Sequence, residues 1–146
     1  MSEIIKGNEA REKLLSGVKK LADAVTATMG PHGRTVIIKD ERNKPYNTKD
    51  GVSVADYIKL KDYVENLGAQ MVKEAARSTA EQAGDGTTTS TLLIYKLLEA
   101  GIYFLENGGT YNEVKEIYDR DIPIVLKDLA QQAQMVTPDN IVDVAT

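Results

Sequence analysis

Apolar residues recur at helical spacing in four long stretches of the chain, and the first covers residues 9–28. Its apolar positions predict one amphipathic helix with a single buried face: Leu14, Leu15, Val18, Leu21, Ala22 and Val25. Asn8 precedes this stretch as a candidate N-cap. Gly30-Pro31 follows it, and a glycine with a following proline is a typical helix stop.

Two further helices are predicted in the middle of the chain. One begins near Asp62 and ends at Gly84, with a predicted buried stripe of Val64, Leu67, Met71, Val72, Ala75 and Ala76. The next covers residues 87–106 and ends before Gly108-Gly109. Its predicted inward positions include Leu93, Leu97, Ala100 and Leu105.

A capping box predicts the start of the fourth helix. Thr110 and Glu113 have the right spacing to cap each other's backbone amides. The apolar positions that follow predict one buried face: Val114, Ile117, Tyr118, Val125 and Leu129. Pro123 lies inside this pattern, and we expect a kink there because proline lacks the backbone donor and crowds the preceding turn.

Three short stretches have the composition of β-strands. SEIIKG at 2–7 predicts a short strand, and RTVIIKD at 34–40, with its β-branched residues, predicts a buried one. A polar turn, ERNKP, separates the second from YNTK at 46–49, so these two should form a hairpin. Asp50-Gly51 is a further turn signal. The predicted fold class is therefore mainly α with a small β portion.

Composition and charge limit the classes of function. The chain has 146 residues, of which 42% are hydrophobic, which suits one domain with a real core. A net charge of −4 argues against nucleic-acid binding, which needs a basic surface. No apolar stretch is long enough for a bilayer, and the first residues lack the apolar core of a signal peptide. Without cysteines the chain also fits a reducing compartment, so we expect a cytoplasmic protein.

The segment GDGTTTS at 84–90 is the main candidate for chemistry. The first amides of a helix lack intrahelical partners, and the helix dipole is positive there. Gly86, Thr87, Thr88 and Thr89 could therefore hold phosphate oxygens. Asp85 would repel that phosphate unless a cation such as Mg²⁺ lay between them. The alternative is that Asp85 or Thr87 only caps the helix.

Two other segments carry weaker signals. TMGPHGR at 28–34 could present backbone groups to a base or ribose, or could simply stop a helix. In TKDG at 48–51, Lys49 could pair with phosphate and Asp50 could orient a water or act as a weak base. The alternative there is a hairpin turn with a solvated lysine. His32 is interpreted as a surface loop residue.

Four segments together resemble the N-terminal part of type I chaperonins, the GroEL family. They are LADAVTATMGPHGRTVIIKD, TKDGVSVA, ENLGAQMVKEAA and AGDGTTTSTLL. The resemblance covers residues 7–146 and is strongest between Leu21 and Leu93. It implies a helical equatorial-type domain over residues 1–131 and the start of an intermediate domain over 132–146.

The resemblance also implies the ligands and the function. It implies binding of ATP or ADP with Mg²⁺, in a subunit of a homo-oligomeric ring that folds non-native client proteins, usually with a co-chaperonin lid. Asp85 matches the magnesium ligand, and Asp50 matches an acidic residue that assists hydrolysis. The nucleotide-contacting positions are matched by Thr28, Met29, Gly30, Pro31, Lys49, Gly86, Thr87, Thr88 and Thr89. Residues 2–7 and 34–49 match strands that join neighbouring subunits.

The chain also departs from the family pattern. Family members are several times longer, and the missing part holds the main catalytic aspartate, so ATP hydrolysis by this chain is left open. Thr137-Pro138 predicts a new helix close to the last residue, which we take as the sign of a longer protein. The alternative is a short chaperonin-like interaction protein that joins or inhibits rings through a strand edge, without its own ATPase activity. In either case we expect an exposed apolar patch, and with it self-association or partial disorder near the C-terminus.

Overall fold

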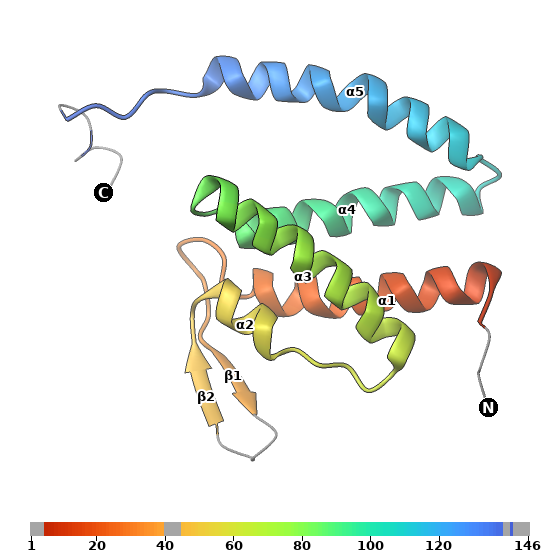
Figure 1. Ribbon diagram of the computed structural model, residues 1–146, viewed down its shortest axis with the longest axis horizontal. Coiled ribbons are helices and arrows are strands. Elements are labelled where there is room, and N and C mark those ends of the chain that lie inside the picture. The colour runs from red at the N-terminus through yellow and green to blue at the C-terminus, as the bar shows by residue number, and fades with distance from the viewer. Residues whose placement is uncertain (1–4, 40–44, 139–140, 142–146) are drawn as a thin grey trace. The chain divides into compact units, whose positions relative to one another are not determined.

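The computed structural model describes residues 5–39, 45–138 and 141. Within these residues the chain forms five helices and one small sheet (Figure 1). The elements in chain order are α1 (Gly7–Thr26), β1 (Val36–Lys39), β2 (Pro45–Thr48), α2 (Gly51–Tyr57), α3 (Tyr63–Ala83), α4 (Thr87–Glu106) and α5 (Tyr111–Gln132). Two compact units divide the chain, Met1–Tyr103 and Phe104–Thr146, and each is described by itself. The prediction of a mainly α fold with a small β portion is confirmed.

The long helices begin and end close to the predicted positions. The Asp62 carboxylate accepts hydrogen bonds from the amides of Val64 and Glu65 and so caps α3, which Gly84 ends in the left-handed conformation. The capping box at the start of α5 is also present, since Thr110 and Glu113 bond each other's backbone amides. Helix α5 continues through Pro123, and the predicted kink stays a prediction.

The start of α1 differs from the prediction. The helix begins at Gly7, so Asn8 lies inside it, and the N-cap position is Lys6, whose side chain makes no capping hydrogen bond. The predicted strand at 2–7 is wrong at its described end, because Ile5 and Lys6 lie in no strand and Gly7 is already helical. Residues 2–4 of that prediction lie outside the described residues.

The predicted hairpin is confirmed as an antiparallel pair of β1 and β2. Val36 pairs with Thr48 and Lys39 with Pro45. The prediction that the first strand is buried is wrong, since Ile37 has 72% of its surface exposed while Val36 and Ile38 pack against the core. The two-stranded sheet therefore has one covered face and one open face. The turn predicted at 41–45 lies outside the described residues except for Pro45, the first residue of β2.

Helix α2 is absent from the sequence predictions. The Asp50-Gly51 turn signal marks the start of this helix, with Asp50 as its N-cap. Seven residues contain too few turns for a helical period to stand out against a strand or loop pattern. The buried side chains of Val54 and Ala55 hold α2 against the core.

The packing of α1 against α3 forms the core of residues 5–103. The side chains of Leu21, Val25 and Val54 are fully buried, and each contributes about 1.5–3 kcal/mol relative to exposure. The two helices touch through backbone at two glycines. A Cβ atom added at Gly17 would lie 1.8 Å from the Glu65 carbonyl oxygen, and one added at Gly68 would lie 2.4 Å from that of Leu14. No larger residue fits there at the observed separation.

The buried face of α4 differs from the prediction. Thr87, Thr91 and Tyr95 are its buried residues, one turn apart along the helix. The predicted inward positions Leu93, Leu97 and Ala100 are exposed, and Leu105 is half-buried. Apolar residues surround most of this helix, so the hydrophobic period did not single out one face.

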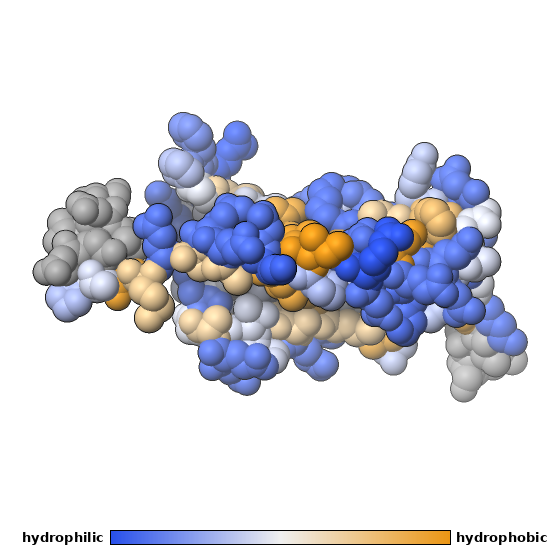
Figure 2. Space-filling model, turned by 90° about the horizontal axis from the view of Figure 1, so that it is seen from above, coloured by the Kyte–Doolittle hydropathy of each residue, from blue (hydrophilic) through white to orange (hydrophobic). Residues whose placement is uncertain are grey.

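Other predicted core positions are also exposed in the described structure. In α3, Val72 and Ala76 are buried, but Leu67, Met71 and Ala75 are exposed. Helix α5 has no buried residue; Val125 and Leu129 are exposed. Figure 2 shows hydrophobic residues lying openly among hydrophilic ones on one face of the molecule. The predicted exposed apolar surface is therefore present, and self-association stays a prediction.

None of the helices in the described residues is both long enough and apolar enough to cross a lipid bilayer.

The contact between α1 and α3 leads to a first prediction. Gly17→Ala or Gly68→Ala should lower the free energy of unfolding by about 1–3 kcal/mol, because the added methyl group overlaps a backbone carbonyl of the facing helix. Chemical denaturation followed by circular dichroism measures this change. Glu12→Ala, at an exposed position of α1, serves as the control and should change stability by less than about 0.5 kcal/mol. Unchanged stability of both glycine variants would contradict the packing described.

Candidate functional site

Three backbone amides at the start of α4 are open, in the sense that no protein group within the described residues accepts a hydrogen bond from them. The amide of Ser90 donates to the Gly86 carbonyl at 2.8 Å, which is the first helical hydrogen bond of this helix. In the part of the chain that the structure describes, no protein group accepts a hydrogen bond from the amides of Thr87, Thr88 or Thr89. These donors can therefore bind an anion.

Asp85 lies next to these amides but does not cap them. Its Oδ1 accepts a hydrogen bond from the amide of Gly86 at 2.6 Å, and its side chain is exposed. By contrast, Asp50, Asp62 and Thr110 each bond amides inside the first turn of the helix that follows. The alternative reading, in which Asp85 serves as an ordinary N-cap of α4, finds no support in these contacts.

The segment after α1 forms a closed loop. The amide of Arg34 donates to the Ala27 carbonyl at 2.7 Å, and the amide of Gly33 donates to the Gly30 carbonyl at 2.9 Å. Thr28 Oγ1 donates to the Val25 carbonyl at 2.7 Å, which fixes this hydroxyl at the end of the helix. The rest of the loop is open to solvent, including Met29, Gly30, Pro31 and His32.

Asp50 is held by three hydrogen bonds. Its carboxylate accepts from the amides of Val52 and Ser53, at 3.3 and 2.9 Å, and from the Ser53 hydroxyl at 2.7 Å. These donors, the Ser53 hydroxyl first, lower the pKa of Asp50. A carboxylate with a lowered pKa accepts a proton poorly, so this geometry suits orientation of a water better than general-base catalysis. Lys49, directly before it, is exposed.

The three predicted segments meet at Gly51. This residue is buried, and a Cβ atom added to it would lie 2.2 Å from Thr88 Oγ1 and 3.4 Å from Thr28 Oγ1. The loop after α1, the start of α2 and the start of α4 therefore share one small region. Gly51 was part of a quoted motif but was not predicted as a site residue, because only the fold brings a threonine hydroxyl against its Cα.

The arrangement suits a phosphate-bound cation better than a metal held by protein alone. No group of three or more histidine, cysteine, aspartate or glutamate residues lies together within the described ranges. Asp85 could supply one oxygen ligand while phosphate oxygens and waters supply the others, which is a common arrangement for Mg²⁺. The open amides of α4 could then bind the same phosphates.

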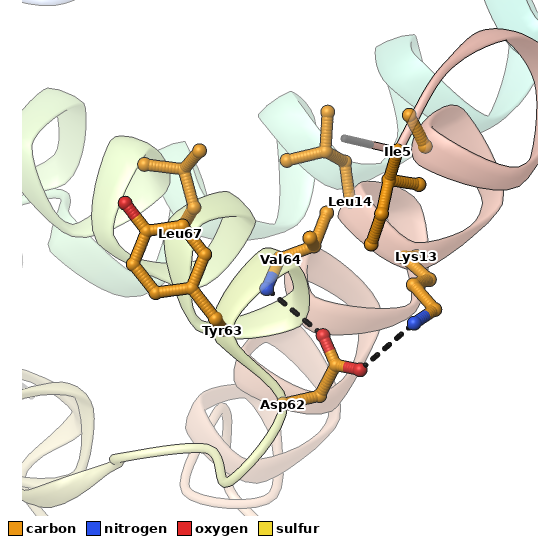
Figure 3. Close-up of a pocket in the computed structure, with 8 residues that line it drawn as sticks. Ile5, Lys13, Leu14, Asp62, Tyr63, Val64 and Leu67 are labelled. Atoms are coloured by element: carbon orange, nitrogen blue, oxygen red, sulfur yellow. Dashed lines mark hydrogen bonds and ion pairs between the residues drawn. The ribbon is translucent and has the colours of Figure 1, made fainter. Parts of the chain in front are cut away.

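Two hollows lie outside this region. One, of about 350 Å³, lies where α1 and α3 begin, and includes the Lys13–Asp62 ion pair beside Leu14, Val64 and Leu67 (Figure 3). The other, of about 430 Å³, is almost wholly apolar and lies among α1, α3 and α4. Neither contains a residue that the sequence predicted for ligand binding.

Comparison with known proteins identifies the family. Residues 21–146 match the model of the TCP-1/cpn60 chaperonin family. The chain is also similar to the crystal structure of the chaperonin gp146 from the bacteriophage EL 2 (Pseudomonas aeruginosa), determined in the presence of ATP-BeFx, with 33% identity and a TM-score of 0.66. This similarity covers 79% of the chain but 20% of the phage protein. The chain belongs to the TCP-1/cpn60 chaperonin family, and its fold is that of a chaperonin equatorial-type domain.

The contact at Gly51 leads to a second prediction. Gly51→Ala should lower the free energy of unfolding by about 1–3 kcal/mol, because its methyl group overlaps Thr88 Oγ1. Thr88→Ala removes that oxygen, so the double variant should be more stable than the sum of the single changes by about 1 kcal/mol. Denaturant unfolding of the four proteins measures this coupling. Val52→Ala, at the exposed neighbouring position, is the control. Strictly additive changes would mean that Gly51 and Thr88 do not touch.

Proposed function

We propose that this chain is the nucleotide-binding part of an ATP-dependent chaperonin subunit and that it binds ATP or ADP with Mg²⁺. In this proposal Gly86 lets the phosphates approach the backbone, and the amides of Thr87, Thr88 and Thr89 bind phosphate oxygens. Asp85 holds the cation, which supplies positive charge to the phosphates when bound. The observation that carries the proposal is the start of α4, where open amides lie beside a carboxylate that caps none of them.

The other predicted residues fit around this centre. Thr28 reaches the same region through the contact at Gly51, and Met29, Gly30 and Pro31 follow it as a surface for the base or ribose. Lys49 would pair with phosphate as a point charge. Asp50, fixed by its hydrogen bonds, would orient an attacking water while remaining ionised.

The proposal also covers domain organisation and assembly, since the similarity spans only 20% of the phage chaperonin. We propose that residues 1–131 are the first part of the equatorial domain and that residues 132–146 lead into an intermediate domain. The family relationship supports assembly into a homo-oligomeric ring that folds client proteins, with a co-chaperonin lid. The proposal for this chain covers nucleotide binding, not ATP hydrolysis. A cytoplasmic location fits a chain without cysteines.

A second candidate function is an interaction protein that joins or inhibits chaperonin rings without its own ATPase activity. The two-stranded sheet favours it, because within the described residues each of its strands has one edge without a strand partner, and such an edge can pair with another strand. Co-elution of this chain with a full-length chaperonin ring, together with absence of nucleotide binding, would favour this function over the first.

The proposed function leads to a third prediction. Isothermal titration of the chain with ATP and with ADP should show weak binding that requires Mg²⁺. Asp85→Ala should weaken Mg-nucleotide binding by about tenfold, because the cation loses its protein ligand. In excess EDTA, neither protein should bind nucleotide measurably.

Glu81→Ala is the matched control for this titration. It removes an acidic side chain from an exposed position of α3 and should leave the affinity unchanged. Circular dichroism shows whether Asp85→Ala keeps its helices. Equal Mg-nucleotide binding by the wild type and Asp85→Ala, or none by either, would overturn the site assignment.

A further inference from the structure

Helix α2 connects the candidate nucleotide site to α3. With seven residues it is too short to be stable alone, so its position depends on its contacts. At its beginning is Gly51, which follows the N-cap Asp50 and lies beside Thr28 and Thr88. A displacement of the C-terminal end of α2 should therefore also displace Gly51 relative to Thr28 and Thr88.

A buried lysine holds the far end of α2. Lys73 of α3 has only 3% of its surface exposed, and its ammonium group donates a hydrogen bond to the carbonyl of Ile58, the C-cap of α2. A cation at this position also interacts favourably with the negative end of the helix dipole. Burial lowers the pKa of Lys73, Asp56 opposes this change, and Arg77 and Lys59 add to it.

An ion pair lies beside this hydrogen bond. The guanidinium of Arg77 contacts the carboxylate of Asp56 in α2. Arg77 follows Lys73 by four residues, so both cations lie on the same side of α3. Two separate polar contacts thus link the second half of α2 to α3, while Val54 and Ala55 pack into the core.

We propose that Lys73 and Arg77 are positioning residues for the nucleotide site: through α2, they hold residues 48–51 in place, with Gly51 against Thr28 and Thr88. The proposal rests on the proposed function where it concerns nucleotide affinity. When either contact is lost, α2 moves in a larger share of the molecules. The apparent affinity then falls in proportion to the fraction of molecules that keep the binding-competent arrangement.

The first test is Lys73→Met, which keeps most of the apolar stem and removes the ammonium group. The affinity for Mg-ADP should fall by about tenfold, because the Ile58 carbonyl loses its donor. In the nucleotide-free protein, the NMR amide signals of Gly51, Thr28 and Thr88 should shift, which a purely global loss of stability would not cause. Unchanged signals and unchanged affinity would overturn the proposal for Lys73.

The second test uses exposed residues, so it remains decisive if Lys73→Met does not fold. Asp56→Lys and Arg77→Glu should each weaken Mg-ADP binding by about two- to fivefold and shift the same three amide signals. The double variant restores the ion pair with reversed polarity. Its Mg-ADP affinity and its three amide signals should therefore return most of the way to those of the wild type. Lys19→Glu, in the exposed Lys19–Asp23 pair of α1, is the matched control and should change neither.

The outcomes separate this proposal from the proposed function. If the wild type binds no Mg-nucleotide, the proposed function fails, and the amide signals alone decide whether Lys73 and Arg77 position residues 48–51. If the wild type binds and Asp85→Ala does not, while the charge reversals change neither affinity nor signals, the positioning role is wrong and the nucleotide site stands.

Discussion

The close packing of α1 against α3 is the constraint on which the rest of residues 5–103 depends. Two glycines bring the helix backbones into contact, and the fully buried side chains of Leu21 and Val25 lie beyond that contact on α1. Because the end of α1 continues into the loop at Thr28, the separation of the helices also sets where this hydroxyl lies. The short helix α2 then packs against both, with Gly51 against the end of α1 and the start of α4.

The start of α4 differs from the starts of α2, α3 and α5 for a physical reason that bears on function, although α1 also begins without a side-chain cap. Helices α2, α3 and α5 each begin with a side chain that satisfies their first amides. At α4 the neighbouring carboxylate, Asp85, bonds only the amide before the helix, and three helical amides are left without a protein acceptor within the described residues. Capped amides stabilise a helix, whereas open amides beside a carboxylate suit a phosphate with its cation. Because α1 also lacks a side-chain cap, it is the presence of Asp85 beside the unpaired amides, and not the missing cap alone, that favours ligand binding at α4.

The sequence predicted the long helices well because the residues that start and end them act locally. Asp62 and the Thr110–Glu113 pair bond backbone amides within three residues, and Gly84 ends α3 through its own left-handed conformation. Sequence-based prediction failed where the burial of a residue or the formation of a helix depended on packing against segments distant in the sequence. The buried face of α4 contains Thr91 and Tyr95 instead of the leucines, and α2 is too short to show a period. At the candidate site, the motifs predicted Asp85 and the threonines as ligand-binding residues, which stays a prediction. Only the fold revealed Gly51 as the meeting point and Lys73 as the residue that binds the end of α2.

The most direct measurement of the central claim is paramagnetic broadening of NMR amide signals when Mn²⁺ replaces Mg²⁺ with ADP. The account predicts the strongest broadening at the amides of Gly86, Thr87, Thr88 and Thr89, with weaker effects at Thr28 and Gly51. It predicts none at the Lys13–Asp62 hollow. Broadening centred on another part of the chain, or equal with and without ADP, would contradict the claim that the start of α4 binds a metal-bound phosphate.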